Sequence, residues 1–254
     1  MATEAARASL LGLPCELRLQ IFSYLLVNDE DPPPNRWEAG DRERRKYEIY
    51  LLDDDPALHF TQVSAINRSV HDEVHKYMDG GSVRGDAELD LMIVGYEFWP
   101  TWTRLPALLR PGKPFDLNLT LRIYSTDVFP TLASRAIYWL LKSLLRNGPR
   151  LVLPRDATTR EREREPFHID TLSVSVVFHD NYTPMTHPGA VAEIFRCFEQ
   201  LAYSNVPWQN VKRISVHAEY DGSQGRVCES REWLVKETVG LIRDSQEWKE
   251  YFPS

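Results

Sequence analysis

The second half of the chain contains three stretches in which apolar and polar residues alternate with a period of two. They lie at 117–123, 172–178 and 211–218. This alternation is typical of a β-strand that buries one face and leaves the other in a polar environment. The pattern therefore predicts three strands, each with one apolar and one polar side.

A pattern with helical spacing follows each of these stretches. Apolar residues recur three or four positions apart over 137–145, 191–201 and 233–242. Gly148 ends the first predicted helix, and the third is predicted to begin near Ser230. Because strand, helix and strand follow one another repeatedly, we expect right-handed crossovers and parallel strands.

One face of this sheet is expected to carry no helices, because strands covered on both faces are apolar throughout. We predict an α/β fold, with α+β as the alternative, whose open, mainly parallel sheet is backed by helices and resembles that of an irregular leucine-rich repeat. The open face is a candidate surface for a substrate protein; alternatively it is only solvated, or covered by the N-terminal half. The side chains predicted to line it are Thr120, Arg122, Ser173, Ser175, Arg213, Ser215 and His217.

A short amphipathic helix is predicted near the N-terminus, within the stretch Leu10 to Leu26. Pro14 has a fixed φ and no amide hydrogen, so it suits the first helical turn. Glu16 then lies favourably at the positive end of the helix dipole. One face of this helix is apolar and requires burial against another surface. Its residues are Leu17, Ile21, Phe22 and Leu25.

The region that follows this helix combines a loop pattern with a second helical pattern. Residues 29–43 contain three consecutive prolines among charged residues, which predicts an exposed, partly mobile loop. Apolar residues at helical spacing over 63–77 predict an amphipathic helix that ends at Gly80. Leu89 to Tyr96 is expected to be extended, and the prolines at 100 and 106 are expected to interrupt regular structure after it.

The N-terminal helix resembles the opening of an F-box, whose general form is Leu-Pro-x-Glu-Leu followed after a few residues by Ile-Phe-x-Tyr-Leu. The matching residues are Leu13, Pro14, Glu16, Leu17, Ile21, Phe22, Tyr24 and Leu25. The resemblance implies that this segment docks on the small adaptor subunit of a cullin-RING ubiquitin ligase, while the rest of the chain captures a substrate. The adaptor-binding face would consist of Leu13, Pro14, Leu17, Ile21, Phe22 and Leu25.

A second segment, at 60–78, is similar to the second signature of a large group of uncharacterised fungal proteins with F-box-like N-termini. Val63, Ile66, Arg68 and Glu73 match that signature, whereas Ser64 stands where the pattern has a cysteine. The match supports the same implied role for the N-terminal part of the chain.

The order of these patterns also suggests how the chain is organised. An F-box continues directly into further short helices, but here 28–55 is inserted and is rich in proline and charge. We therefore divide the chain into an F-box-like helical part at 1–80, which carries this insertion, and an α/β body at 81–254. We expect the two parts to be integrated in one body.

Composition excludes several classes of protein. With 43% hydrophobic and 26% charged residues, the chain has the composition of an ordinary globular protein. No segment is apolar enough to predict a membrane span, and a net charge of −7 argues against broad affinity for nucleic acid. The three cysteines, at 15, 197 and 228, form no Cys-x-x-Cys pair. These features predict a protein of the cytoplasm or nucleus, with no membrane or nucleic-acid partner.

No set of residues with the spacing of a known catalytic or metal motif emerges. His71 and His75 lie four residues apart, but Asp72 stands where a zinc protease has glutamate, and no third ligand follows at a recognisable spacing. The glycines near residue 80 lack the context of a phosphate-binding loop. Cys197 lies among apolar residues, which is typical of a packing thiol. We therefore expect no enzyme, no metal site and no cofactor.

Taken together, the patterns predict a non-catalytic protein-interaction module that binds protein partners, including the ligase adaptor. The alternative is a self-contained fungal interaction or regulatory domain with no ligase role, whose N-terminal helix belongs to its own core. Solvent exposure of Ile21 and Phe22 distinguishes the two hypotheses, because exposed apolar residues invite a partner and buried ones form core.

Overall fold

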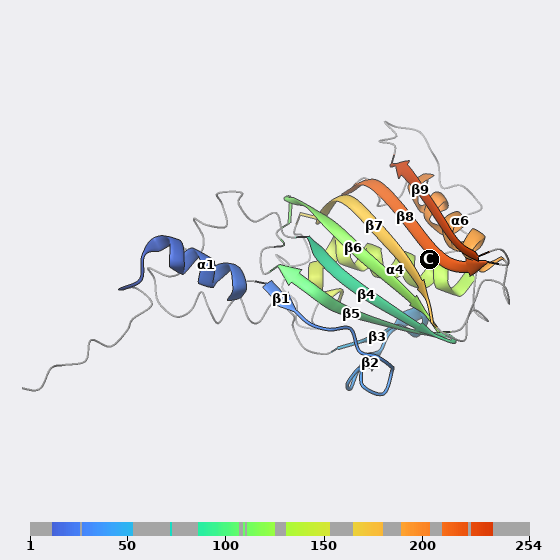
Figure 1. Ribbon diagram of the computed structural model, residues 1–254, viewed down its shortest axis with the longest axis horizontal. Coiled ribbons are helices and arrows are strands. Elements are labelled where there is room, and N and C mark those ends of the chain that lie inside the picture. The colour runs from blue at the N-terminus through green and yellow to red at the C-terminus, as the bar shows by residue number, and fades with distance from the viewer. Residues whose placement is uncertain are drawn as a thin grey trace, which may run out of the picture.

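A seven-stranded sheet forms the body of the protein in the computed structural model (Figure 1). The structure describes residues 12–25, 27–52, 72, 86–106, 109, 111–124, 131–152, 165–179, 189–203, 210–222 and 225–235. The N-terminal elements are α1 (Cys15–Leu25), β1 (Val27–Asp29), β2 (Glu43–Arg44), η2 (Lys46–Glu48) and β3 (Tyr50–Leu51). The body then adds β4 (Ala87–Val94), β5 (Glu97–Pro106), β6 (Pro114–Ile123), α4 (Thr131–Asn147), η3 (Gly148–Arg150), β7 (His168–Phe178), α6 (Ala190–Tyr203), β8 (Val211–Gly222) and β9 (Gly225–Leu234).

The sheet is mixed, with parallel strands at its centre and antiparallel strands at both edges. Its strand order is β1-β5-β4-β6-β7-β8-β9. The four central strands β4, β6, β7 and β8 are parallel, whereas β1 and β5 on one side and β9 on the other run antiparallel to their neighbours. The prediction of an α/β protein with parallel strands is confirmed for the centre, and the edges make the sheet mixed.

Helices α4 and α6 lie on one face of the sheet (Figure 1). They connect β6 to β7 and β7 to β8, as the strand–helix–strand pattern predicts. Their apolar stripes are buried against the apolar side of the strands, which carries Leu119, Val174 and Val216. The predicted helix residues that are buried here are Ile137, Leu140, Leu141, Leu144, Leu145, Val191, Ile194, Phe195, Phe198 and Leu201.

The prediction of a helix that begins near Ser230 is wrong, because Gly225–Leu234 forms strand β9. Gly222 pairs with Gly225 across a connection of two residues, so the chain reverses and returns antiparallel to β8. Short connections of this kind make hairpins, and glycine is the residue most often found in them. Of the two alternatives for the first buried residue of that helix, Trp233 is buried and Leu234 is exposed, and both belong to a strand rather than a helix. The remainder of the predicted helix lies outside the described residues.

The interruption predicted at Pro100 is also wrong, because β5 runs through this proline, whereas β5 ends at Pro106 as predicted. Pro100 lies opposite Leu91 of β4, and the short strand β1 pairs with β5 only from Arg104 to Pro106. Over most of its length β5 is therefore bonded by strands on one side only, and proline is tolerated where its missing N–H faces away from the ladder.

Residues 30–42 form an irregular and mostly exposed loop, as predicted for 29–43, and the segment 27–52 that contains this loop is anchored to the body. β1 pairs with β5, and Ile49 and Leu51 are buried in the same core as the helices. The side chain of Trp37 is 80% exposed, which agrees with the prediction that this loop is exposed to solvent. The predicted helix at 63–77, its Gly80 end and the second fungal-type signature lie outside the described residues, apart from Asp72.

The three thiols differ in accessibility, which predicts a simple reactivity pattern. Cys15 and Cys228 are exposed, whereas Cys197 is buried, and burial raises the pKa of its thiol to about 11. Because the thiolate is the reactive form, we expect alkylation of Cys15 and Cys228 in the native protein and of Cys197 only on unfolding. Mass spectrometry of peptides after a short iodoacetamide pulse measures this. Equal labelling of all three thiols without denaturant would contradict the packing of α6.

Candidate functional site

The face of the sheet opposite α4 and α6 carries rows of small polar side chains. Strand register places Ser173 beside Asn118 and Ser215 in one row. In the next row Ser175 lies between Thr120 and His217. The predicted residues of the three strands are thus brought onto one surface, and Figure 1 views the sheet from this side.

Arg122 and Arg213, both predicted to line this face, differ in how exposed their side chains are. The Arg213 side chain is half exposed and donates a hydrogen bond to the Thr171 hydroxyl at 3.1 Å. The side chain of Arg122 is only 15% exposed and is fully engaged by neighbouring groups. Arg213 is therefore available to a partner, whereas Arg122 acts inside the fold.

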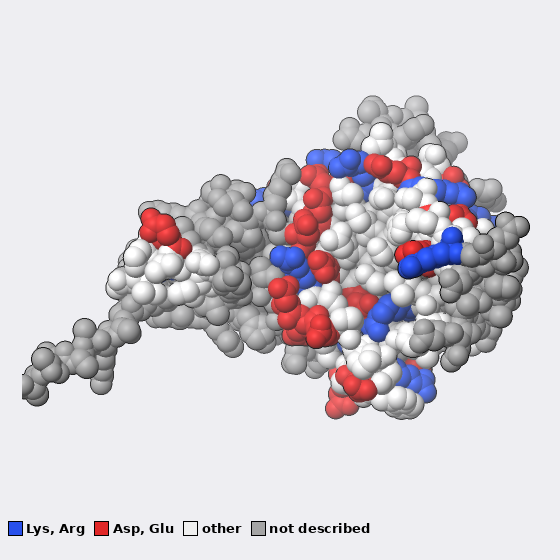
Figure 2. Space-filling model, viewed as in Figure 1, with Lys and Arg blue, Asp and Glu red and all other residues white. Residues whose placement is uncertain are grey.

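A hollow of about 460 Å³ opens on this face beside β4 and β1. Its lining is Asp29, Glu30, Asp31, Pro32, Glu88, Asp90, Thr103, Thr120 and Arg122. Five of these nine residues are acidic, and Figure 2 shows acidic side chains gathered across this end of the sheet. Arg104 lies 3.6 Å from Asp29 and 3.9 Å from Glu88, so it offsets only part of that charge. Such a surface attracts cationic groups and repels anionic ones.

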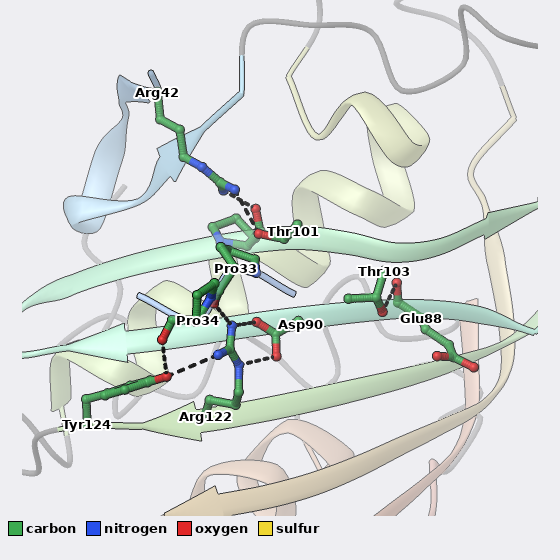
Figure 3. Close-up of polar contacts among 10 residues, drawn as sticks. Pro33, Pro34, Arg42, Glu88, Asp90, Thr101, Thr103, Arg122 and Tyr124 are labelled. Carbon is green, nitrogen blue, oxygen red and sulfur yellow. Dashed lines mark hydrogen bonds and ion pairs between the residues drawn. The ribbon is translucent and has the colours of Figure 1, made fainter. Parts of the chain in front are cut away.

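A buried ion pair between Asp90 and Arg122 forms one wall of the hollow (Figure 3). Arg122 Nε donates to Asp90 Oδ2 at 2.7 Å and Nη2 donates to Oδ1 at 2.6 Å, which is the bidentate geometry of a strong pair. The Asp90 side chain is only 3% exposed. Burial raises the pKa of this carboxyl, while the hydrogen bonds from Arg122 act in the opposite direction.

The same guanidinium holds the N-terminal segment on the sheet. Arg122 Nη2 also donates to the Pro33 carbonyl at 2.8 Å, and Nη1 donates to the Tyr124 hydroxyl at 3.1 Å. Tyr124 in turn donates its hydroxyl hydrogen to the Pro34 carbonyl at 2.8 Å (Figure 3). Proline carbonyls retain full acceptor capacity, so Pro33 and Pro34 attach this exposed loop to the sheet.

Arg42 anchors the segment at a second point. Its guanidinium donates to the Thr101 hydroxyl at 2.8 Å and to the Pro100 carbonyl (Figure 3). Desolvation by burial lowers its pKa to about 10, although the charge of Asp90 opposes this shift. The polar face is therefore covered at its β5 side by residues 30–42 and open at its β7–β9 side.

The N-terminal helix α1 lies outside the sheet core, at the end of the molecule next to β1 (Figure 1). It begins at Cys15, one residue after the predicted start at Pro14, and the Pro14 carbonyl accepts a hydrogen bond from the Arg18 N–H at 3.1 Å. Leu17 is 47% exposed and Pro14 is exposed, whereas Leu13 and Ile21 are partly buried. The side chains of Phe22 and Leu25 lie outside the described residues.

His217 and Cys228 form a second cluster of reactive types on the open face. The Cys228 sulfur lies 3.8 Å from His217 Nε2, and both residues are exposed. Among the described residues, no group of three His, Cys, Asp or Glu side chains could hold a metal ion. His71 and His75 lie outside the described residues.

Sequence reasoning missed the acidic lining and the buried pair. Glu88 and Asp90 alternate with Ala87, Leu89 and Leu91, which is the signal that places both carboxylates on the polar face. Nothing in the sequence pairs Asp90 with Arg122, because the two lie on separate strands and meet only through the parallel register of β4 and β6.

Comparison with known proteins identifies no relatives. No family model matches the chain, and neither a curated protein nor a solved structure matches it. Within the part of the chain that the structure describes, no helix is both long and apolar enough to cross a bilayer.

Proposed function

We propose that this chain is a non-catalytic protein-interaction module in which α1 docks on the adaptor subunit of a cullin-RING ubiquitin ligase. In this proposal the open face of the sheet binds the protein to be ubiquitinated. The observation that carries the first half is the position of α1: Leu17, a central residue of the F-box-like motif, is 47% exposed on a helix outside the sheet core. An exposed leucine on a helix outside the core suits helix-in-groove recognition by a partner.

The second half of the proposal is supported by the character of the open face. Its β7–β9 side offers serine, arginine and histidine side chains at regular spacing, which can form hydrogen bonds to a protein partner.

The self-contained module remains the second candidate, and it is supported by the partial burial of Ile21. In that case α1 would pack on the chain's own apolar surface and would have no ligase role. A charge on the apolar side of α1 distinguishes the two candidates. It should weaken adaptor binding if α1 docks on the adaptor, and it should destabilise the fold if α1 belongs to the chain's own core.

The experiment that tests the proposal is a binding titration of the full chain with the purified adaptor, monitored by calorimetry. We expect wild-type protein to bind and Leu17→Asp to weaken binding at least about tenfold, because the charge would be buried in the complex. Gln20→Asp, on the same helix but outside the apolar stripe, is the matched control and should bind like wild type.

Circular dichroism and thermal melting of the same variants distinguish the two candidates. A Leu17→Asp protein that keeps the wild-type melting temperature but loses binding supports adaptor docking. Absence of binding by wild-type protein, combined with a lowered melting temperature for Leu17→Asp, would instead support the self-contained module.

A further inference from the structure

Strand β9 ends the sheet on the side opposite β1, and in the described part of the chain no strand pairs with its outer edge. It contains ten residues, Gly225–Leu234, which is long for an edge strand. An edge of this length presents a row of backbone N–H and C=O groups that another strand can bond.

The hairpin geometry determines which β9 residues direct their backbone groups outward. Gly222 and Gly225 close a connection of two residues, and the closing pair of such a hairpin is hydrogen-bonded. Bonded and non-bonded pairs then alternate, and the Val235 N–H indeed donates to the Lys212 carbonyl at 2.9 Å. Odd-numbered residues of β9 therefore bond to β8. The residues whose N–H and C=O point to the outer edge are Arg226, Cys228, Ser230, Glu232 and Leu234.

A second copy of this strand can pair with that edge only in certain registers. In an antiparallel pair related by a two-fold axis, each residue whose backbone groups point outward must lie opposite another such residue. A register centred on an even-numbered residue of β9 pairs outward-bonding residues with one another throughout. Registers centred on Glu229 or Arg231 satisfy the same condition, but they place two like charges directly opposite each other on the axis.

The register centred on Ser230 is complementary in charge and in hydrophobicity. It places Glu229 of each copy opposite Arg231 of the other copy, which gives two equivalent pairs, one on each side of the axis. The next pair outward is Val227 with Trp233. Glu229 with Arg231 is a non-hydrogen-bonded pair in this register, the type in which opposing side chains approach most closely.

Both charged side chains are already held on the required face of the sheet. Glu229 Oε1 accepts a hydrogen bond from the Tyr220 hydroxyl at 2.5 Å, and the Arg231 guanidinium lies 4.8 Å from the ring centre of Phe195. Each contact fixes the side chain on the helix-bearing side of the sheet, so little conformational entropy remains to be lost when the strands pair.

We propose that two copies of this chain associate through antiparallel pairing of their β9 strands about Ser230, which joins the two sheets into one continuous sheet. The contact is isologous and closes as a dimer. Each β9 edge is then paired, and no edge is left in this contact for a further copy to extend into a fibre. It lies at the opposite side of the sheet from β1, next to which α1 is found, and it does not depend on adaptor binding.

Sedimentation velocity of the full chain from about 1 to 200 μM tests the proposal. We expect a monomer–dimer equilibrium for wild-type protein. Arg231→Glu and Glu229→Arg should each weaken the dimer at least about tenfold, because two attractive cross-strand pairs become repulsive. The double variant Glu229→Arg with Arg231→Glu restores both pairs in reverse and should recover the dimer. A wild-type protein that stays monomeric, or a double variant no better than the single ones, would overturn the proposal.

Disulfide trapping provides a second measurement that does not depend on how well the charge variants fold. Ser230→Cys in a Cys228→Ser background places two thiols directly across the axis, where the Cα atoms of a hydrogen-bonded pair lie about 5.5 Å apart, within disulfide range. Mild oxidation should then yield a covalent dimer. The wild-type protein, in which Cys228 faces Glu232, should not form one. Equal crosslinking of both proteins, or crosslinking of neither, would contradict the Ser230 register.

Discussion

Replacing Arg122 by alanine is expected to lower the free energy of unfolding by about 3–5 kcal/mol. The change leaves the Asp90 carboxylate buried without its partner and removes the hydrogen bonds to Pro33 and Tyr124. Chemical denaturation monitored by circular dichroism measures this change in the free energy of unfolding. Arg213→Ala is the matched control on the same face, because its half-exposed guanidinium should contribute no more than about 0.5 kcal/mol.

The pH dependence of the same variant provides an independent check. Burial raises the pKa of Asp90, and loss of Arg122 removes the interaction that opposes this rise. When the pKa of a carboxyl is higher in the folded state than in the unfolded state, the protein loses stability as the pH rises from the unfolded-state pKa through the folded-state pKa. The deficit of Arg122→Ala relative to wild type should therefore be smaller near pH 4 than at pH 8. A deficit that is independent of pH would contradict an unpaired buried carboxylate as its cause.

Gly148→Ala is expected to cost about 2–4 kcal/mol, the second-largest effect of a single substitution. Gly148 ends α4 with φ of +73°, and an added Cβ would lie 2.5 Å from Cζ of the buried Phe167 ring. Backbone strain and a steric clash with a packed ring therefore act together. Thermal and chemical denaturation measure the loss.

Gly95→Ala separates these two contributions. Gly95 also has a positive φ, of +58°, but an added Cβ would meet no atom within 4 Å. Its cost should be near 1 kcal/mol, which represents the backbone strain alone. If both alanine variants lose the same stability, the packing of Phe167 against the end of α4 is not as described.

The elements that could be predicted from sequence are those in which one periodicity extends over many residues. β6 alternates throughout, β7 alternates from Leu172 and β8 from Ile214, and α4 and α6 each carry an apolar stripe, so local pattern and tertiary burial agree. The end of α4 was predictable for the same reason, because glycine tolerates the positive φ at Gly148.

The elements that could not be predicted depend on their neighbours in the sheet. The apolar residues of β9 fit a short helix as well as a strand, and pairing with β8 decides between the two. β5 continues through Pro100 because it has a bonded strand on one side only over most of its length, which no local signal reveals.

The candidate site was predictable only in part, for a related reason. Alternation predicted the polar face, and the F-box-like pattern predicts that Leu17 contacts a partner. The role of Arg122 depends on Asp90, 32 residues earlier, and on proline carbonyls of the N-terminal segment. Long-range contacts of this kind follow from strand order, which the sequence pattern does not specify.

Hydrogen–deuterium exchange of the full chain with and without the purified ligase adaptor tests the central claim most directly. The proposal predicts that adaptor binding slows exchange in the peptide covering α1 (Cys15–Leu25) and leaves β6–β8 unchanged. Unchanged exchange in α1 at adaptor concentrations that saturate known F-box proteins would contradict docking through this helix.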